Sequence, residues 1–193
     1  IVHSAEMLDR KSLASVGDTT GERLTALLTE TKAHTPEELA ANVARIGELL
    51  GRFALYVPAR FTDDPAEQAK YWAVRSGIFP AVGGSRPAGT TCLSEDVAFH
   101  IEDLPRATAE LQALIARHGY DACIYGHALE DNYHFIINQS FSPPAEVARY
   151  EALMNDVAEL VSAGTTARSK PSMARGATWR PSSAASRATT PWP

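Results

Sequence analysis

Apolar residues recur at helical spacing in three parts of the chain, and two capping motifs mark where helices begin. Leu39, Val43, Ile46 and Leu50 follow a capping box at residues 35–38 and end before Gly51. A second helix begins at Asp64-Pro65 by the same capping logic, a third begins near Asp103, and Pro143-Pro144 introduces a last one. The pattern therefore predicts helices over residues 36–50, from 65 to the glycines at 83–84, over 103–118, and from 144 onward.

Between these helices, β-branched and aromatic residues cluster in short runs that predict strands. The runs cover residues 24–31, 53–61 and 90–101, with two more inside 121–141. The last two strands are too close for a helical crossover, so they must be antiparallel. We predict an α+β fold, in which an antiparallel sheet carries helices mainly on one face.

Charge divides the chain at residue 163. All the acidic residues precede it, whereas residues 164–193 consist mostly of Ala, Ser, Thr, Arg and Pro, which predicts a disordered tail. The net charge of −5 gives no basis for nucleic-acid binding, and no stretch is apolar enough to span a membrane. Cys92 and Cys123 form no C-x-x-C pair, which favours the reducing cytoplasm.

The run from Tyr125 to Phe135 holds the strongest candidate for chemistry. His127 precedes a turn and His134 lies in the strand after it, where alternation puts His134 on the face opposite Tyr133 and Phe135. Two imidazoles on converging segments can hold a divalent metal such as Zn or Mn. The spacing alone also allows two ordinary hydrogen-bonding histidines.

Residues 126–135 resemble the G-H-A-x-x-G-N-x-H-F signature of the C-terminal (cap) domain of FAD-linked 2-hydroxyacid dehydrogenases and oxidases. That family includes D-lactate and D-2-hydroxyglutarate dehydrogenases and the glycolate oxidase flavin subunit, and the resemblance covers roughly residues 6–162. It implies His127 and His134 as metal ligands and Asn132 as a cofactor contact. Residues 71–80 resemble the family's W-x-x-R helix, which implies that Arg75 binds the substrate carboxylate.

Other positions match the family less closely. Arg86 lies in a matching loop and could face substrate or flavin, although an ordinary loop arginine fits equally well. One of Glu95 and Asp96 is expected to pair with Arg75 or Arg86. Asp131 stands where the family usually has Gly, and a positive φ there would suit Asp better than most residues but less well than Gly.

The resemblance also implies parts that this sequence lacks. The family's FAD-binding domain precedes the cap domain, so we expect residues 1–20 to be a lead-in segment and residues 21–163 to be the cap domain. The sequence G-H-A-L-E-x-N at residues 126–132 resembles the corresponding motif of long family members that carry a fused iron–sulfur region. The expected partners are therefore a 2-hydroxy acid, an FAD-binding domain and an iron–sulfur region, in a cytoplasmic protein that is peripheral to a membrane in the parent enzyme.

The tail suggests a shifted reading frame. In the family, the last helix leads to a segment like D-G-S-L-K-A-E-H-G-T-G-R-N-M-A-P-F, which supplies a further metal-ligand Glu and a catalytic His. Read one base earlier, codons for Met173-Ala174 allow His-Gly, and those for Trp179-Arg180 allow Met-Ala. We therefore expect residues from about Ala163 onward to be out of frame, and we assign no catalytic residue within this chain.

The expected function is the oxidation of a 2-hydroxy acid to a 2-oxo acid by a parent FAD enzyme, with this chain as the substrate- and metal-binding domain, inactive alone. One alternative is a folded fragment without catalysis. Another is an independent metal-dependent hydrolase that uses both histidines with Glu130 or Asp131.

Overall fold

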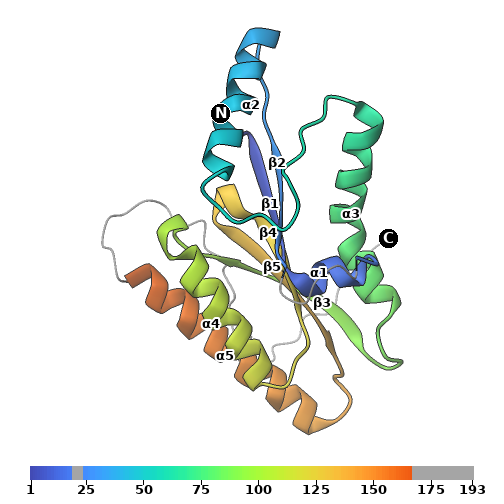
Figure 1. Ribbon diagram of the computed structural model, residues 1–193. Coiled ribbons are helices and arrows are strands. Elements are labelled where there is room, and N and C mark those ends of the chain that lie inside the picture. Colours follow the sequence, from blue (N-terminus) through green and yellow to red (C-terminus); the bar gives the residue numbers. More distant parts are fainter. Residues whose placement is uncertain (19–23, 167–193) are drawn as a thin grey trace, which may run out of the picture.

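A computed structural model describes residues 1–18 and 24–166, and these residues form one sheet with helices on both of its faces (Figure 1). The strands are β1 (Ser4–Leu8), β2 (Ala26–Glu30), β3 (Thr91–Ala98), β4 (Cys123–His127) and β5 (Asn132–Gln139). The helices are α1 (Arg10–Ser15), α2 (Pro36–Leu50), α3 (Pro65–Gly84), α4 (Leu104–Arg117) and α5 (Pro144–Thr166), with short 3-10 turns η1 (Ile101–Asp103) and η2 (Ala128–Glu130). The predicted α+β class is confirmed.

The sheet has the strand order β2-β1-β4-β5-β3, and every neighbouring pair is antiparallel, as predicted. Strand β1 is interior, because it pairs with β2 on one side and with β4 on the other. Residues expected to form a lead-in segment thus supply a strand of the sheet itself. This position places Glu6 directly opposite His127.

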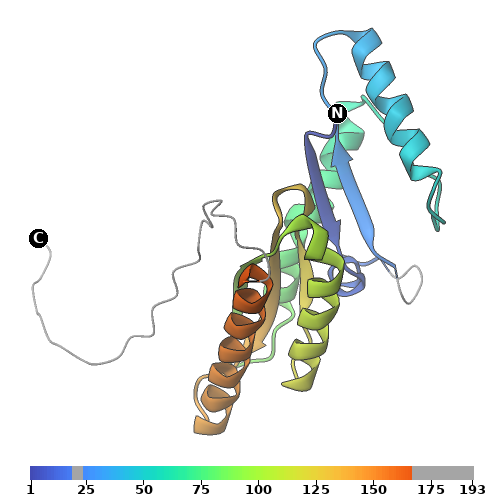
Figure 2. The ribbon, with the colours of Figure 1, turned by 90° about the vertical axis from the view of Figure 1, so that its left-hand side faces the viewer.

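Helices α4 and α5 cover one face of the sheet and enclose the larger hydrophobic core. Leu111, Leu153, Phe135 and Ile137 are fully buried there. Each such side chain contributes about 1.5–3 kcal/mol of transfer free energy. The two helices lie side by side in front of the sheet, with α3 behind it (Figure 2). Val147, in the first turn of α5, is exposed.

Helices α1 and α3 cover part of the other face with a smaller core. Ile78 of α3 and Ile136 of β5 are fully buried, and Leu13 of α1 packs with them and with Tyr125. Asp9 caps α1 by accepting a hydrogen bond from the Ser12 backbone N–H at 2.8 Å. Helices α1 and α3 stop covering this face next to the two histidines. Arg75 of α3 therefore lies on the same side of the sheet as these rings.

The predicted caps of α2 and α3 are confirmed, since Thr35 accepts from the Glu38 N–H and Asp64 from the Ala66 N–H. The strand expected at residues 53–61 is wrong. This segment has no regular structure, and most of its large apolar side chains are exposed. Its apolar run includes Pro58, which cannot donate to a ladder, and it pairs with no strand of the sheet.

The tail predicted from residue 164 lies outside the described residues, apart from the last helical positions of α5 up to Thr166. Among the helices within residues 1–18 and 24–166, none has both the length and the apolar character needed to cross a bilayer.

Candidate functional site

His127 and His134 come together across the β4–β5 hairpin. His127 ends β4, and His134 lies in β5 opposite Tyr125. Their ring centroids are 5.4 Å apart, with the rings nearly perpendicular. Alternation along β5 places His134 on the α3 side, while Tyr133 and Phe135 point into the larger core, as predicted. The two imidazoles therefore share one face of the sheet.

Gly126 allows the two strands to approach beside the histidines. Its φ is 151°, and an added Cβ would lie 2.6 Å from the Asn132 carbonyl oxygen and 2.9 Å from the Tyr133 Cα. Both neighbours are backbone atoms, which cannot rotate away as a flexible side chain could. Glycine is thus required for this close pairing of β4 with β5.

Asp131 ends the turn in the left-handed conformation with a φ of 60°, as its match to a family glycine suggested. One of its carboxylate oxygens, Oδ1, is buried and has no hydrogen-bond partner among the described residues. Burial raises the pKa of Asp131 above its ordinary value of 3.8. The position therefore carries both backbone strain and a desolvated carboxylate.

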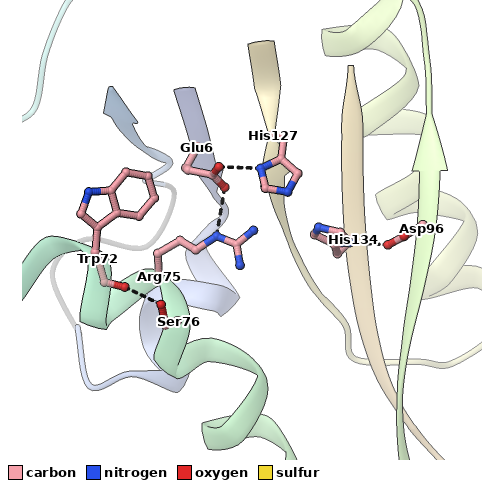
Figure 3. Close-up of polar contacts among 7 residues, drawn as sticks. All are labelled: Glu6, Trp72, Arg75, Ser76, Asp96, His127 and His134. Carbon is pink, nitrogen blue, oxygen red and sulfur yellow. Dashed lines mark hydrogen bonds and ion pairs between the residues drawn. The ribbon is translucent and has the colours of Figure 1, made fainter. Parts of the chain in front are cut away.

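Each imidazole contacts a carboxylate through Nδ1 (Figure 3). His127 Nδ1 lies 2.6 Å from Glu6 Oε1, and His134 Nδ1 contacts Asp96 Oδ1. An ionised carboxylate can only accept a hydrogen bond, so each Nδ1 must carry the proton. The Nε2 lone pair of each neutral ring is then left available for a metal or a proton.

Arg75 reaches this site from α3, as the W-x-x-R resemblance predicted. Its Nε donates to Glu6 Oε2 at 3.0 Å, and its guanidinium carbon lies 4.9 Å from the centroid of the Tyr125 ring. In Figure 3 the rest of the guanidinium extends past Glu6 toward His134. The ring of Tyr125 also contacts His134, with centroids 5.3 Å apart. Burial raises the pKa of Tyr125, which keeps the phenol protonated beside the cation.

Glu6 is the site residue that the sequence analysis missed. Its side chain is 5% exposed, and its two oxygens contact two different cationic or polar groups, Arg75 and His127. The available clue was an acidic residue inside an apolar strand-like run, Ala5 to Leu8. Only the sheet pairing shows which groups compensate its buried charge.

The expected pairing of Glu95 or Asp96 with Arg75 or Arg86 is wrong. Asp96 contacts His134, and Glu95 accepts a hydrogen bond from Tyr150 of α5 at 2.6 Å. These two contacts lie on opposite faces of β3. Arg75 pairs instead with Glu6 of β1.

Arg86 and Asn132 occupy less central positions. Arg86 lies in the loop after α3, where it donates to the carbonyl oxygens of Gly83 at 2.5 Å and Thr90 at 3.2 Å. These bonds hold it within its own loop. Asn132 begins β5 and pairs with His127 across the hairpin, half-buried at the edge of the site.

The sequence profile of the family "FAD linked oxidases, C-terminal domain" matches residues 1–165, which is most of the chain. The chain belongs to this family. A search of curated protein sequences found no match. Among solved structures, the fold is similar to 4-ethylphenol oxidase from Gulosibacter chungangensis in complex with isoeugenol, with 13% identity and a TM-score of 0.48. The match covers 83% of this chain but only 37% of that protein.

Membership of an FAD-linked oxidase family implies FAD chemistry in the whole protein, yet the described residues do not enclose a flavin. A cavity of about 230 Å³ lies between η1, α4 and α5, on the side of the sheet opposite the histidines, with Phe99 and Leu160 in its lining. A cavity of about 20 Å³ lies beside Glu6 and His127. Cofactor pockets are typically about 300–1,000 Å³, so neither of these two cavities has room for a flavin.

The donor set fits part of a metal site. His127 and His134 each bind a carboxylate through Nδ1, which is the usual outer-shell arrangement of metal-ligating histidines. No cluster of three or more His, Cys, Asp or Glu side chains suited to a metal occurs in residues 1–18 and 24–166. The described part of the chain thus offers two imidazole donors and no third protein ligand.

The hydrolase alternative predicted Glu130 or Asp131 as the third member of such a site. The carboxylates that contact the histidines are Glu6 and Asp96 instead. Glu130 is exposed beside the small cavity, and Asp131 keeps its buried Oδ1 without a described partner. No contact in the described residues favours a hydrolase.

Proposed function

We propose that this chain is the substrate-binding domain of an FAD-dependent dehydrogenase that oxidises a small 2-hydroxy acid, such as D-lactate, D-2-hydroxyglutarate or glycolate, to the 2-oxo acid. The observation that carries the proposal is the convergence of Arg75, His127 and His134 on one face of the sheet. Family membership supports the FAD chemistry, and the substrate class is what the sequence resemblance implies, with Arg75 suited to the carboxylate of such an acid.

Arg75 is suited to bind the carboxylate of such an acid. Glu6 occupies its Nε, and among the described residues neither Nη group of the guanidinium has a hydrogen-bond partner, so both are available to a ligand. A carboxylate matches two parallel guanidinium N–H groups, which fixes its orientation as well as its position. We assign Arg75 to this role, and Arg86 to a secondary role at the edge of the substrate.

His127 and His134 would hold a divalent cation such as Zn or Mn through Nε2, with the third ligand supplied from outside the described residues. When bound, such a cation would polarise the substrate hydroxyl and lower its pKa. With neutral imidazoles, Glu6 and Asp96 outweigh Arg75 by one negative charge. A dication reverses this balance, so the site becomes complementary to an anionic substrate.

The remaining parts of the reaction lie beyond these residues. A flavin held by a preceding FAD domain would supply the hydride acceptor for the substrate Cα, and Asn132 would lie at the edge of that contact. The hydroxyl proton would pass to a base that we do not assign to this chain. An iron–sulfur region would fit as a further partner of the parent protein. We therefore expect no turnover by this domain alone.

Ligand binding tests the proposal directly. The chain is titrated with D-lactate and with propionate, which lacks the hydroxyl, in the presence and absence of Zn²⁺, and heat is measured by calorimetry. We expect zinc-dependent binding of lactate and weaker binding of propionate. Arg75→Met should weaken lactate binding about 10- to 100-fold, the value of a charge-assisted pair. Arg106→Met provides a matched control, because Arg106 lies on α4 and pairs with Asp103 and Glu110.

Equal binding of lactate and propionate would refute a 2-hydroxy acid site, as would an unchanged affinity in Arg75→Met. Loss of binding in Arg106→Met as well would indicate an indirect effect on folding rather than a contact with the ligand.

A further inference from the structure

Glu6 belongs to the candidate site, although the motifs that identified Arg75, His127 and His134 do not include it. It lies on the interior strand β1, and its side chain is almost entirely buried. A buried carboxylate costs several kcal/mol unless charged or polar partners compensate it. Glu6 has two such partners, and both belong to the candidate site.

The two partners use different oxygens of the same carboxylate. Oε2 accepts from Arg75 Nε at 3.0 Å, while Oε1 lies 2.6 Å from His127 Nδ1. Arg75 arrives from α3 and His127 from the end of β4, so the carboxylate is a bridge between two elements that approach it from different directions (Figure 3).

The geometry of this bridge leaves the functional atoms of both partners free. A contact through Nε spares the two Nη groups of Arg75, which a side-by-side contact with the fork would occupy. A contact through Nδ1 fixes the proton of His127 on that nitrogen and leaves Nε2 as an acceptor. His134 has a separate partner, Asp96, that does not contact Arg75.

We propose that Glu6 is a positioning residue that locks Arg75 and His127 together, so that the carboxylate-binding fork and one imidazole Nε2 keep a fixed relation to each other. This proposal rests on the proposed function, because a fixed relation between Arg75 and His127 is useful if Arg75 binds a substrate carboxylate beside a metal held by His127. Asp96 orients the ring of His134 alone.

The isosteric change Glu6→Gln separates this role from simple space filling. A glutamine amide has one accepting and one donating end, so it cannot accept from Arg75 and His127 together. The proton positions of the histidine rings are read from long-range ¹H–¹⁵N correlations of the metal-free full chain at one pH where both rings are neutral. We expect Nδ1–H on both rings of the wild type, and a shift of His127 toward Nε2–H in Glu6→Gln with His134 unchanged.

Two further variants keep the test decisive. Asp96→Asn should change His134 and leave His127 unchanged. Arg75→Met removes the other partner of Glu6 but leaves its carboxylate able to accept from His127, so His127 should keep Nδ1–H. If Glu6→Gln does not fold, the wild type still tests the bridge, because Nε2–H on its His127 would show that Glu6 does not accept from Nδ1.

A second measurement follows the consequence for a ligand. Zn²⁺ affinity, measured by competition with a chromophoric chelator, should fall about 10- to 100-fold in Glu6→Gln, as is usual when an outer-shell carboxylate of a histidine ligand is lost. A merely structural Glu6 would lower the stability of the fold and leave both the His127 proton and the zinc affinity of the folded protein unchanged. That result overturns the proposal.

The two proposals can fail separately. Nδ1–H on His127 that persists in Glu6→Gln, or Nε2–H on His127 in the wild type, refutes the lock, whatever the chain binds. Failure to bind any 2-hydroxy acid refutes the proposed function but leaves the proton positions, measured without metal or substrate, as a valid test of the lock.

Discussion

Replacement of Gly126 by alanine should weaken the fold at the point where the two histidines meet. Gly126 pairs with Tyr133 in the β4–β5 ladder, and its φ of 151° lies in a region that L-residues rarely adopt. The added Cβ would lie 2.6 Å from the Asn132 carbonyl oxygen, well short of the roughly 3.5 Å of an unstrained contact. The strands can relieve this contact only by moving apart.

The expected loss follows from two costs. Placing alanine at this backbone conformation costs about 1–3 kcal/mol, and forcing a methyl group into a filled space costs about 1–3 kcal/mol more. Their sum of about 2–6 kcal/mol is a large share of the ~5–15 kcal/mol that stabilises a typical domain. Gly126→Ala should therefore be strongly destabilised.

The free energy of unfolding is measured by urea titration with far-ultraviolet circular dichroism. Gly47→Ala is the matched control, because Gly47 lies inside α2 and an added Cβ there meets nothing within 4 Å. The control should be stabilised by about 0.5–1 kcal/mol, the helix-propensity gain. A decrease of less than about 1 kcal/mol in the free energy of unfolding of Gly126→Ala would contradict the argument that the close approach of β4 to β5 requires glycine here.

Three other outcomes follow from the same structure. Asp131→Gly should stabilise the chain by about 1 kcal/mol, because it removes a left-handed non-glycine residue; urea titration measures the gain, and a loss would contradict the strain argument. Burial raises the pKa of Asp9 above 3.8, so its contribution to stability is full below the unfolded pKa and is lost as pH rises through the folded pKa. Asp9→Asn should therefore gain stability relative to wild type at neutral pH and lose that advantage in acid, and an unchanged pH profile would refute this assignment. Burial also raises the pKa of the Cys123 thiol to about 12, so a thiol reagent should modify Cys92 first and Cys123 only on unfolding; equal rates would contradict the burial of Cys123.

The local elements could largely be predicted from the sequence, because their causes are local. Thr35 and Asp64 begin helices through their own side chains, and the hairpin around Asp131 follows from a short turn between two apolar runs. The alternation that separates His134 from Phe135 requires only the two-residue period of a strand. The segment at 53–61 failed because an apolar run shows β-propensity whether or not a partner strand exists.

The connections between distant elements could not be predicted. Glu6 is 121 residues from His127 and 69 from Arg75; the β1–β4 pairing brings Glu6 opposite His127, and Arg75 reaches Glu6 from α3. The sequence therefore indicated Arg75 and both histidines through a family resemblance, but it gave Asp96 the wrong partner and left Glu6 unassigned. Non-local contacts of this kind depend on topology, which local patterns do not specify.

The most direct test of the account is the binding of D-lactate to the zinc-loaded chain, followed by the NMR signals of the His127 and His134 rings and the Arg75 Nε–H group. The account predicts that lactate perturbs all three residues in the wild type, and that propionate perturbs Arg75 but the histidines much less, since it lacks the hydroxyl. Lactate that leaves the histidine and Arg75 signals unchanged would contradict the assignment of these residues to a 2-hydroxy acid site.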